Sequence, residues 1–282
     1  MRRAWMIPVS FLLAAAPATG AIPWDRIDGG GDLKGIYLEV AEEVLNTAPC
    51  YGGCGKTVAA CLASNPDDKI ARRIAAFVAR RVRADKDESE ILEEIEDRRL
   101  SAFPEQTYAP DLTGLIVSGD PKAPIQVVLY ADFGCPYCRV TSIALRKRVV
   151  KQPKEIALYF KNYPLKAHEY AVPAALALLA AEKQGKFWEM HDALFEGDAD
   201  LTRTRIDELA GKIGLDLAKL HADEKEKDLV ARLRAEKMEG LQFGVEKTPG
   251  ILVNGKFYRG VRTWEELRDR IEEEKEIIAL GM

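Results

Sequence analysis

The sequence has few histidines and no excess of basic charge, and each shortage excludes a class of function. Its 282 residues include three histidines, His168, His191 and His221, whose spacing is not that of metal ligands. We therefore predict no metal site built on histidine. Lysine and arginine together number 41 against 45 acidic residues, a formal net charge of −4, so no basic face is expected and nucleic-acid binding is excluded.

Long apolar runs are also lacking, apart from one at the start of the chain. Residues 1–20 combine two arginines, an apolar stretch from Trp5 to Ala16 and small residues before the end, which is typical of a secretory signal peptide. The apolar stretch is shorter than the roughly 20 residues that span a bilayer. We expect the chain to be periplasmic or otherwise exported, with retention of the segment as a membrane anchor as the alternative.

Cysteine is scarce, and its five positions form two groups. Cys50, Cys54 and Cys61 lie in CYGGCGKTVAAC, and Cys135 and Cys138 lie in DFGCPYCR. Disulfides form and persist in the compartments that exported proteins reach, so the cysteines are interpreted first as redox chemistry. We predict no cofactor or metal beyond a redox-active cysteine disulfide.

Hydrophobic periodicity divides the chain into two domains. Residues 32–102 show three stretches of helical spacing and predict a small all-α domain of three helices. Residues 103–113 are rich in proline and polar turn formers and predict a linker. Residues 114–279 alternate strand and helix patterns, with a helical insertion at about 167–240 and an Asn254-Gly255 hairpin turn, which predicts an α/β domain with a mixed sheet.

The Cys135-Pro136-Tyr137-Cys138 segment follows a predicted strand and opens a predicted helix. A helix N-terminus presents unpaired N–H groups and partial positive charge, which stabilise a thiolate. Pro136 suits the first turn, where its missing N–H has no partner. We predict that Cys135 is the attacking thiol and that Cys138, one turn further along, resolves the mixed disulfide. A structural disulfide or half of a zinc site is the alternative.

From about residue 111 to 278 the chain resembles the DsbA-like thioredoxin-fold thiol:disulfide oxidoreductases. The resemblance is carried by GDPKAPIQVVLYADFGCPYCR, YFKNYPL, QGKFWEMHDALFE and TPGILVNGKFYRG. It implies a cis peptide at Thr248-Pro249 facing the cysteines, with Thr248, Pro249, Pro136 and Tyr137 contacting substrate. It also implies client proteins that carry thiols or disulfides, and a membrane redox partner that recycles Cys135 and Cys138. The Pro-Tyr dipeptide is similar to that of glutaredoxins and DsbG-type proteins, which favours a role other than a pure oxidase.

Three interpretations of Cys50, Cys54 and Cys61 stay open: a zinc site, an inert disulfide between two of them, and a second redox site. The segment from Ala48 to Phe103 resembles the CcmH-type thiol-reductase domain of cytochrome c maturation, a three-helix unit. Cys50 and Cys54 match the cysteine pair of that family, although three residues separate them here and two in the family.

The sequence thus predicts an exported thiol:disulfide oxidoreductase that exchanges disulfides with client proteins through Cys135 and Cys138. Electrons would pass between Cys135 and the N-terminal cysteine pair. Two alternatives remain: a non-catalytic chaperone that holds thiols of apocytochrome c, and a disulfide isomerase.

Overall fold

The computed structural model describes residues 22–197 and 201–282. The predicted signal peptide, and with it the alternative of a retained anchor, lies outside the described residues. Within the described ranges, no helix combines the length and the apolar character needed to cross a bilayer.

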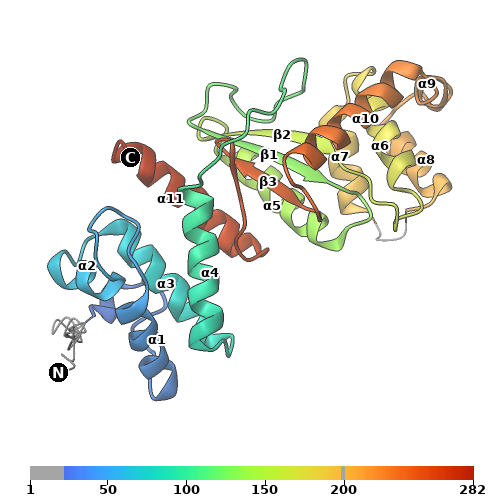
Figure 1. The fold of residues 1–282 in the computed structure, drawn as a ribbon. Coiled ribbons are helices and arrows are strands. Elements are labelled where there is room, and N and C mark those ends of the chain that lie inside the picture. Colours follow the sequence, from blue (N-terminus) through green and yellow to red (C-terminus); the bar gives the residue numbers. More distant parts are fainter. Residues whose placement is uncertain (1–21, 198–200) are drawn as a thin grey trace, which may run out of the picture. The chain divides into compact units, whose positions relative to one another are not determined.

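The chain divides into two compact units, Met1–Leu92 and Glu93–Met282. Within the described part of the first unit, a short 3₁₀ turn at Trp24–Arg26 precedes three helices, α1 (Ile36–Thr47), α2 (Val58–Ser64) and α3 (Lys69–Arg83). Buried apolar side chains of α1 and α3, among them Val44, Leu45, Ile74 and Phe77, form its core. Figure 1 shows these helices in the blue and cyan part of the ribbon. The predicted all-α character is confirmed for this region.

One helix of this unit was not predicted. Helix α2 begins after Thr57, whose side-chain oxygen accepts a hydrogen bond from the Ala60 N–H at 3.3 Å. This is ordinary N-terminal capping. The helix is only seven residues long and carries Cys61, so Cys61 lies on a helix and not in the loop that holds Cys50 and Cys54.

The division between the units falls inside helix α4 (Glu88–Ala102), before the linker predicted at 103–113. The end of α4 is tied to α11 (Trp264–Ala279) by buried charges. The Arg98 guanidinium lies 2.8 Å from the Asp269 carboxylate and 3.1 Å from that of Glu273. These contacts place the second half of α4 with the C-terminal unit, while the limits 32–102, 103–113 and 114–279 stay predictions.

A four-stranded mixed sheet forms the centre of the second unit, in the order β2-β1-β3-β4. Strands β1 (Ile125–Ala131) and β2 (Ile156–Asn162) are parallel, whereas β3 (Gly250–Val253) pairs antiparallel with β1 and with β4 (Lys256–Phe257). The turn between β3 and β4 is Asn254-Gly255, and both residues have positive φ, 49° and 76°. The predicted mixed sheet and hairpin are confirmed.

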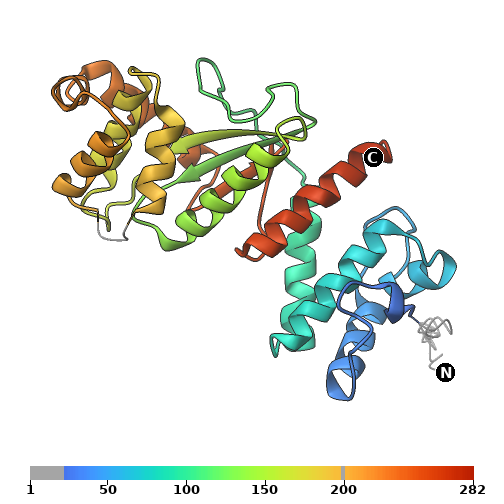
Figure 2. The same cartoon turned by 180° about the vertical axis from the view of Figure 1, so that it is seen from behind.

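Alternate side chains of the strands enter two different cores. Val127 and Leu129 of β1 face α5 (Pro136–Lys151) and α11, whereas Val128 and Tyr130 face the segment 108–117 and the end of α10. Figures 1 and 2 show α5 running along the strands on one side of the sheet. Between β2 and β3 the described residues form the helices α6 (Ala171–Glu182), α7 (Phe187–Glu196), α8 (Arg203–Lys212), α9 (Leu217–Asp223) and α10 (Lys227–Gln242).

Candidate active site

Cys135 and Cys138 lie at the start of helix α5, shortly after strand β1 ends. Cys135 is the N-cap of α5 and Pro136 is its first residue, so the helix begins as its sequence predicts. The Cys135 residue is 6% exposed and Cys138 is 0% exposed. Pro136 and Tyr137 are exposed, Tyr137 to 63%. An incoming sulfur can therefore reach the pair on the side of Cys135.

The Thr248-Pro249 peptide bond lies against this helix start. It is cis, as the family resemblance implies. The Cys135 thiol donates a hydrogen bond to the carbonyl oxygen of Thr248, with an Sγ-to-O distance of 3.5 Å. The Thr248 hydroxyl is buried without a hydrogen-bond partner among the described residues, and the Thr248 side chain lowers the pKa of both cysteines. The structure thus brings together segments that are more than 100 residues apart in the sequence.

The pKa values of the two thiols are shifted in opposite directions. The pKa of Cys135 is lowered from 9.0 to about 5, chiefly because the Cys138 thiol donates a hydrogen bond to the Cys135 thiolate. The Thr248 side chain and the N–H groups of Cys138 and Tyr137 lower it further, and they outweigh the desolvation that raises it. Burial raises the pKa of Cys138. Near neutral pH the site therefore holds one thiolate and one thiol.

Two polar residues lie beside the cysteines, a position that the sequence did not predict for either of them. The buried Asp132 carboxylate accepts hydrogen bonds from the N–H groups of Gly134 and Leu165, both at 2.6 Å. The His168 Nδ1 lies 3.0 Å from the same carboxylate, and a Cβ added at Gly134 would meet the His168 ring at 2.8 Å. Asp132 and His168 thus shape the turn that leads into Cys135.

The two remaining histidines, His191 and His221, contact Ser142, Asp192 and Asp207. His191 is buried between the Ser142 hydroxyl and the Asp192 carboxylate, each 2.8 Å from a ring nitrogen. Burial lowers the pKa of His191. His221 lies 2.9 Å from the carboxylate of Asp207. Each of these contacts is a hydrogen bond to a protein side chain.

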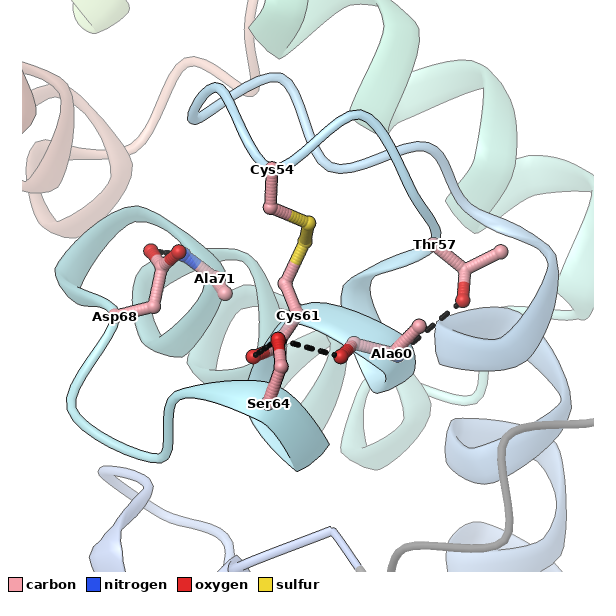
Figure 3. The surroundings of a disulfide bond; sticks show 7 residues. All are labelled: Cys54, Thr57, Ala60, Cys61, Ser64, Asp68 and Ala71. Atoms are coloured by element: carbon pink, nitrogen blue, oxygen red, sulfur yellow. Dashed lines mark hydrogen bonds between the residues drawn. A yellow bond between two sulfur atoms is a disulfide. The ribbon is translucent and has the colours of Figure 1, made fainter.

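In the N-terminal unit a disulfide joins Cys54 to Cys61, with a Cα–Cα distance of 6.0 Å (Figure 3). The family resemblance instead pairs Cys50 with Cys54, and the structure leaves Cys50 as a buried free thiol. The Cys50 N–H donates to the Lys56 carbonyl at 2.9 Å, and the short helix α2 holds Cys61 within bonding distance of Cys54.

The three sulfurs of this group lie within 4.8 Å of one another. That spacing suits a metal ion bound by thiolates, yet sulfurs joined in a disulfide are not thiolate ligands. In the disulfide state only Cys50 has a thiol to offer. The zinc interpretation therefore requires the reduced form, and the second redox site remains a prediction.

Comparison with known proteins identifies the class of the C-terminal unit. The family model described as Thioredoxin matches residues 112–273, more than half of the chain. A thioredoxin-like oxidoreductase from Silicibacter pomeroyi is similar in structure, with a TM-score of 0.53 and 25% identity over 63% of this chain and 98% of that one. The thiol-disulfide exchange protein alpha-DsbA2 from Wolbachia pipientis has a TM-score of 0.52 and 19% identity, covering 64% and 94% of the two chains.

Curated relatives include proteins of different length. Disulfide bond formation protein D of Bacillus subtilis is 25% identical over 58% of this chain and 79% of its own. The Na(+)/H(+) antiporter NhaA 3 of Salinispora tropica is 31% identical over 85% of this chain, a match that extends well beyond residues 112–273. The chain spans about a third, 36%, of the length of that antiporter.

The chain belongs to the thioredoxin family, and the fold of its C-terminal unit is that of the DsbA-like thiol–disulfide oxidoreductases. The predicted thioredoxin fold is confirmed. The resemblance of the N-terminal unit to the CcmH type stays a prediction.

Proposed function

We propose that this protein is an exported oxidoreductase that exchanges disulfides with client proteins through Cys135 and Cys138. One observation supports the proposal most strongly: the reachable thiol has a pKa near 5 and its buried neighbour is held as a thiol. Such a pair separates the two roles that thiol–disulfide exchange requires, an attacking or leaving thiolate and a shielded resolving thiol.

In the oxidised protein, a client thiolate attacks Sγ of Cys135 and breaks the Cys135–Cys138 disulfide, with the electron pair and then a proton going to Cys138. A second client thiolate attacks the client sulfur of the mixed disulfide and releases Cys135. The client gains a disulfide and the enzyme gains two electrons. The lowered pKa makes Cys135 a good leaving group and stabilises the reduced enzyme, which favours this oxidising direction.

The substrate would lie along the exposed start of α5. Tyr137 and Pro136 offer exposed surface beside Cys135, and the carbonyl oxygen of the buried Thr248 contacts its sulfur. An extended client segment next to Cys135 would contact Pro136 and Tyr137, and the family resemblance adds the Thr248-Pro249 backbone. A membrane redox partner would reoxidise the cysteine pair after each cycle.

The test is turnover of a reduced, unfolded disulfide protein in glutathione buffer. Wild type should accelerate disulfide formation, and Cys135→Ser should abolish the acceleration. Retention of the effect in Cys135→Ser would support instead a chaperone without redox catalysis. The reduction potential then sets the direction: about −120 mV marks an oxidant and about −270 mV marks a reductant that needs an electron supply. Rescue of a scrambled disulfide protein would instead support an isomerase.

The proposal keeps the passage of electrons between Cys135 and the N-terminal unit, but with a different cysteine pair from the one that the sequence predicted. The bonded pair is Cys54–Cys61, and Cys54 is half-buried whereas Cys61 is fully buried. Of the two bonded sulfurs, Cys54 is therefore the one more open to attack by an incoming thiolate. In Cys138→Ser, where a mixed disulfide cannot be resolved, the relay predicts a Cys54–Cys135 link. Its absence under conditions that trap client proteins would contradict the relay, together with the tie to cytochrome c maturation.

A further inference from the structure

The N-terminal unit holds one free thiol directly beside a disulfide. The sulfurs of Cys50, Cys54 and Cys61 lie within 4.8 Å of one another, and reacting atoms in productive complexes lie about 3–3.5 Å apart. A shift of one to two ångströms would therefore bring the Cys50 sulfur into bonding reach of the disulfide. A purely structural disulfide does not require a third sulfur at this distance.

The three cysteines differ in how they are held. Cys50 is 5% exposed and is fixed by the hydrogen bond from its N–H to Lys56, and Cys61 is 0% exposed within α2. Cys54 is half-buried and lies between Gly53 and Gly55, which have positive φ values of 97° and 69°. A Cβ added at Gly55 would meet nothing within 4 Å. Cys54 is therefore the sulfur with room to move and with access to water.

We propose that the three cysteines form a thiol–disulfide exchange site of their own, in which Cys50 attacks Sγ of Cys61 and releases Cys54. The Cys50–Cys61 bond forms and the Cys54–Cys61 bond breaks. Cys50 gives up its proton to solvent, and the Cys54 thiolate takes up the electron pair and then a proton. The exchange is internal, so no oxidant or reductant is consumed. It goes beyond the proposed function, because it uses neither Cys135 nor Cys138.

Burial explains why Cys54 leaves and not Cys61. The leaving sulfur carries negative charge, and a half-buried thiolate is solvated better than one inside the core. Attack on Cys54 would instead leave a thiolate on the fully buried Cys61. The exchanged state thus presents a free Cys54 thiol in the glycine-rich loop, where it can meet a disulfide of another protein.

The surroundings of the attacking Cys50 sulfur have opposing effects on its pKa. Burial, the largest effect, raises the pKa of Cys50, and the charge of Asp68 raises it further, although the N–H of Gly52 lowers it by hydrogen bonding to the thiolate. Cys50 therefore rests as a thiol, and the disulfide rests on Cys54 and Cys61. The Gly52 N–H becomes useful at the moment when Cys50 ionises.

The test uses the full chain with Cys135→Ser and Cys138→Ser, so that only the three N-terminal cysteines carry sulfur chemistry. The folded, oxidised protein is treated with iodoacetamide, quenched in acid and cleaved after Tyr51 and after Lys56, which places each cysteine on its own peptide. Mass spectrometry then reads which cysteine carries the label and which two are linked. Failure of this experiment leaves the proposed function untouched, since client exchange is measured at Cys135.

The proposal predicts label on Cys54 together with a Cys50–Cys61 disulfide. Label on Cys50 with the Cys54–Cys61 bond intact would overturn it, as would label on Cys61 or complete protection until the protein is unfolded. Adding Cys50→Ser should remove the label entirely and keep Cys54–Cys61. Cys54→Ser provides a second check: oxidation should link Cys50 to Cys61, and two alkylatable thiols in that variant would contradict the proposal.

Discussion

The sulfur of Cys135 lies 3.5 Å from the carbonyl oxygen of Thr248, a residue 113 positions away in the chain. This contact brings a helix start and the strand-bearing C-terminal segment to one point. It combines the positive end of α5, a shielded second thiol and a buried hydroxyl around one sulfur. The reactivity of Cys135 is therefore a property of the folded unit, and separate changes to its surroundings have separate consequences.

The Thr248 hydroxyl should stabilise the Cys135 thiolate. In Thr248→Val this donor is lost, and a hydrogen bond to a charged group contributes about 1.5–3 kcal/mol. At 1.36 kcal/mol per pKa unit, we expect the pKa of Cys135 to rise by about one to two units. The measurement is the pH dependence of thiolate ultraviolet absorbance. Thr248→Ser keeps the hydroxyl, so the pKa of Cys135 in that variant should stay near the wild-type value. An unchanged pKa in Thr248→Val would show that the hydroxyl does not stabilise the thiolate.

The lowered pKa of Cys135 should make the stability of the reduced protein depend on pH. The group titrates near 5 when folded and near 9.0 when unfolded, so its contribution is complete above pH 9 and is lost as the pH falls through 5. Cys138 stays a thiol across this window. Urea unfolding should show the reduced protein gaining stability relative to the oxidised protein as the pH rises from 5 to 9. A constant difference between the two forms would contradict this expectation.

Asp132 should contribute to stability through the turn before Cys135. Asp132→Asn replaces one carboxylate oxygen by an NH₂ group, which cannot accept from both Gly134 and Leu165. A buried donor left without a partner costs about 1–3 kcal/mol, and we expect the free energy of unfolding to fall by that amount. Asp120→Asn is the matched control, because its hydrogen bond to Lys122 is exposed. Equal losses of stability in Asp132→Asn and Asp120→Asn would contradict a special role of Asp132 in stabilising this turn.

Arg98 should be essential for the packing of α4 on α11. Arg98→Leu would leave the carboxylates of Asp269 and Glu273 buried beside an apolar side chain, and breaking a buried pair in this way costs about 3–5 kcal/mol. Chemical denaturation of the full chain measures the loss. The neighbouring Arg99 pairs with Glu96 at the surface, so Arg99→Leu should cost less than about 1 kcal/mol. Similar losses for both variants would contradict a special role for Arg98.

How much of this site the sequence predicts depends on the range of each interaction. Cys135 and Cys138 could be assigned because the strand, the turn and the helix start around them are local features. Thr248 could be assigned only through the family resemblance, since no local pattern links it to Cys135. Asp132 was overlooked because its partners Leu165 and His168 follow β2 and approach only in the folded sheet.

The N-terminal cysteines show the same limit more sharply. Spacing alone could not decide among the pairings of Cys50, Cys54 and Cys61, because connectivity depends on which sulfurs the fold brings together. The short helix that carries Cys61 decides it in favour of Cys54. The partners of Arg98 at the end of α4, Asp269 and Glu273, also lie far downstream in the sequence, so no local pattern could indicate these contacts.

The most direct test of the account is the rate at which Cys135 is alkylated in the reduced, folded protein as a function of pH, followed by peptide mass spectrometry. The account predicts a rise in rate with its midpoint near pH 5, with Cys138 unlabelled throughout. A midpoint near 9.0, the ordinary value for a cysteine, would show that the fold does not activate Cys135 and would contradict the central claim.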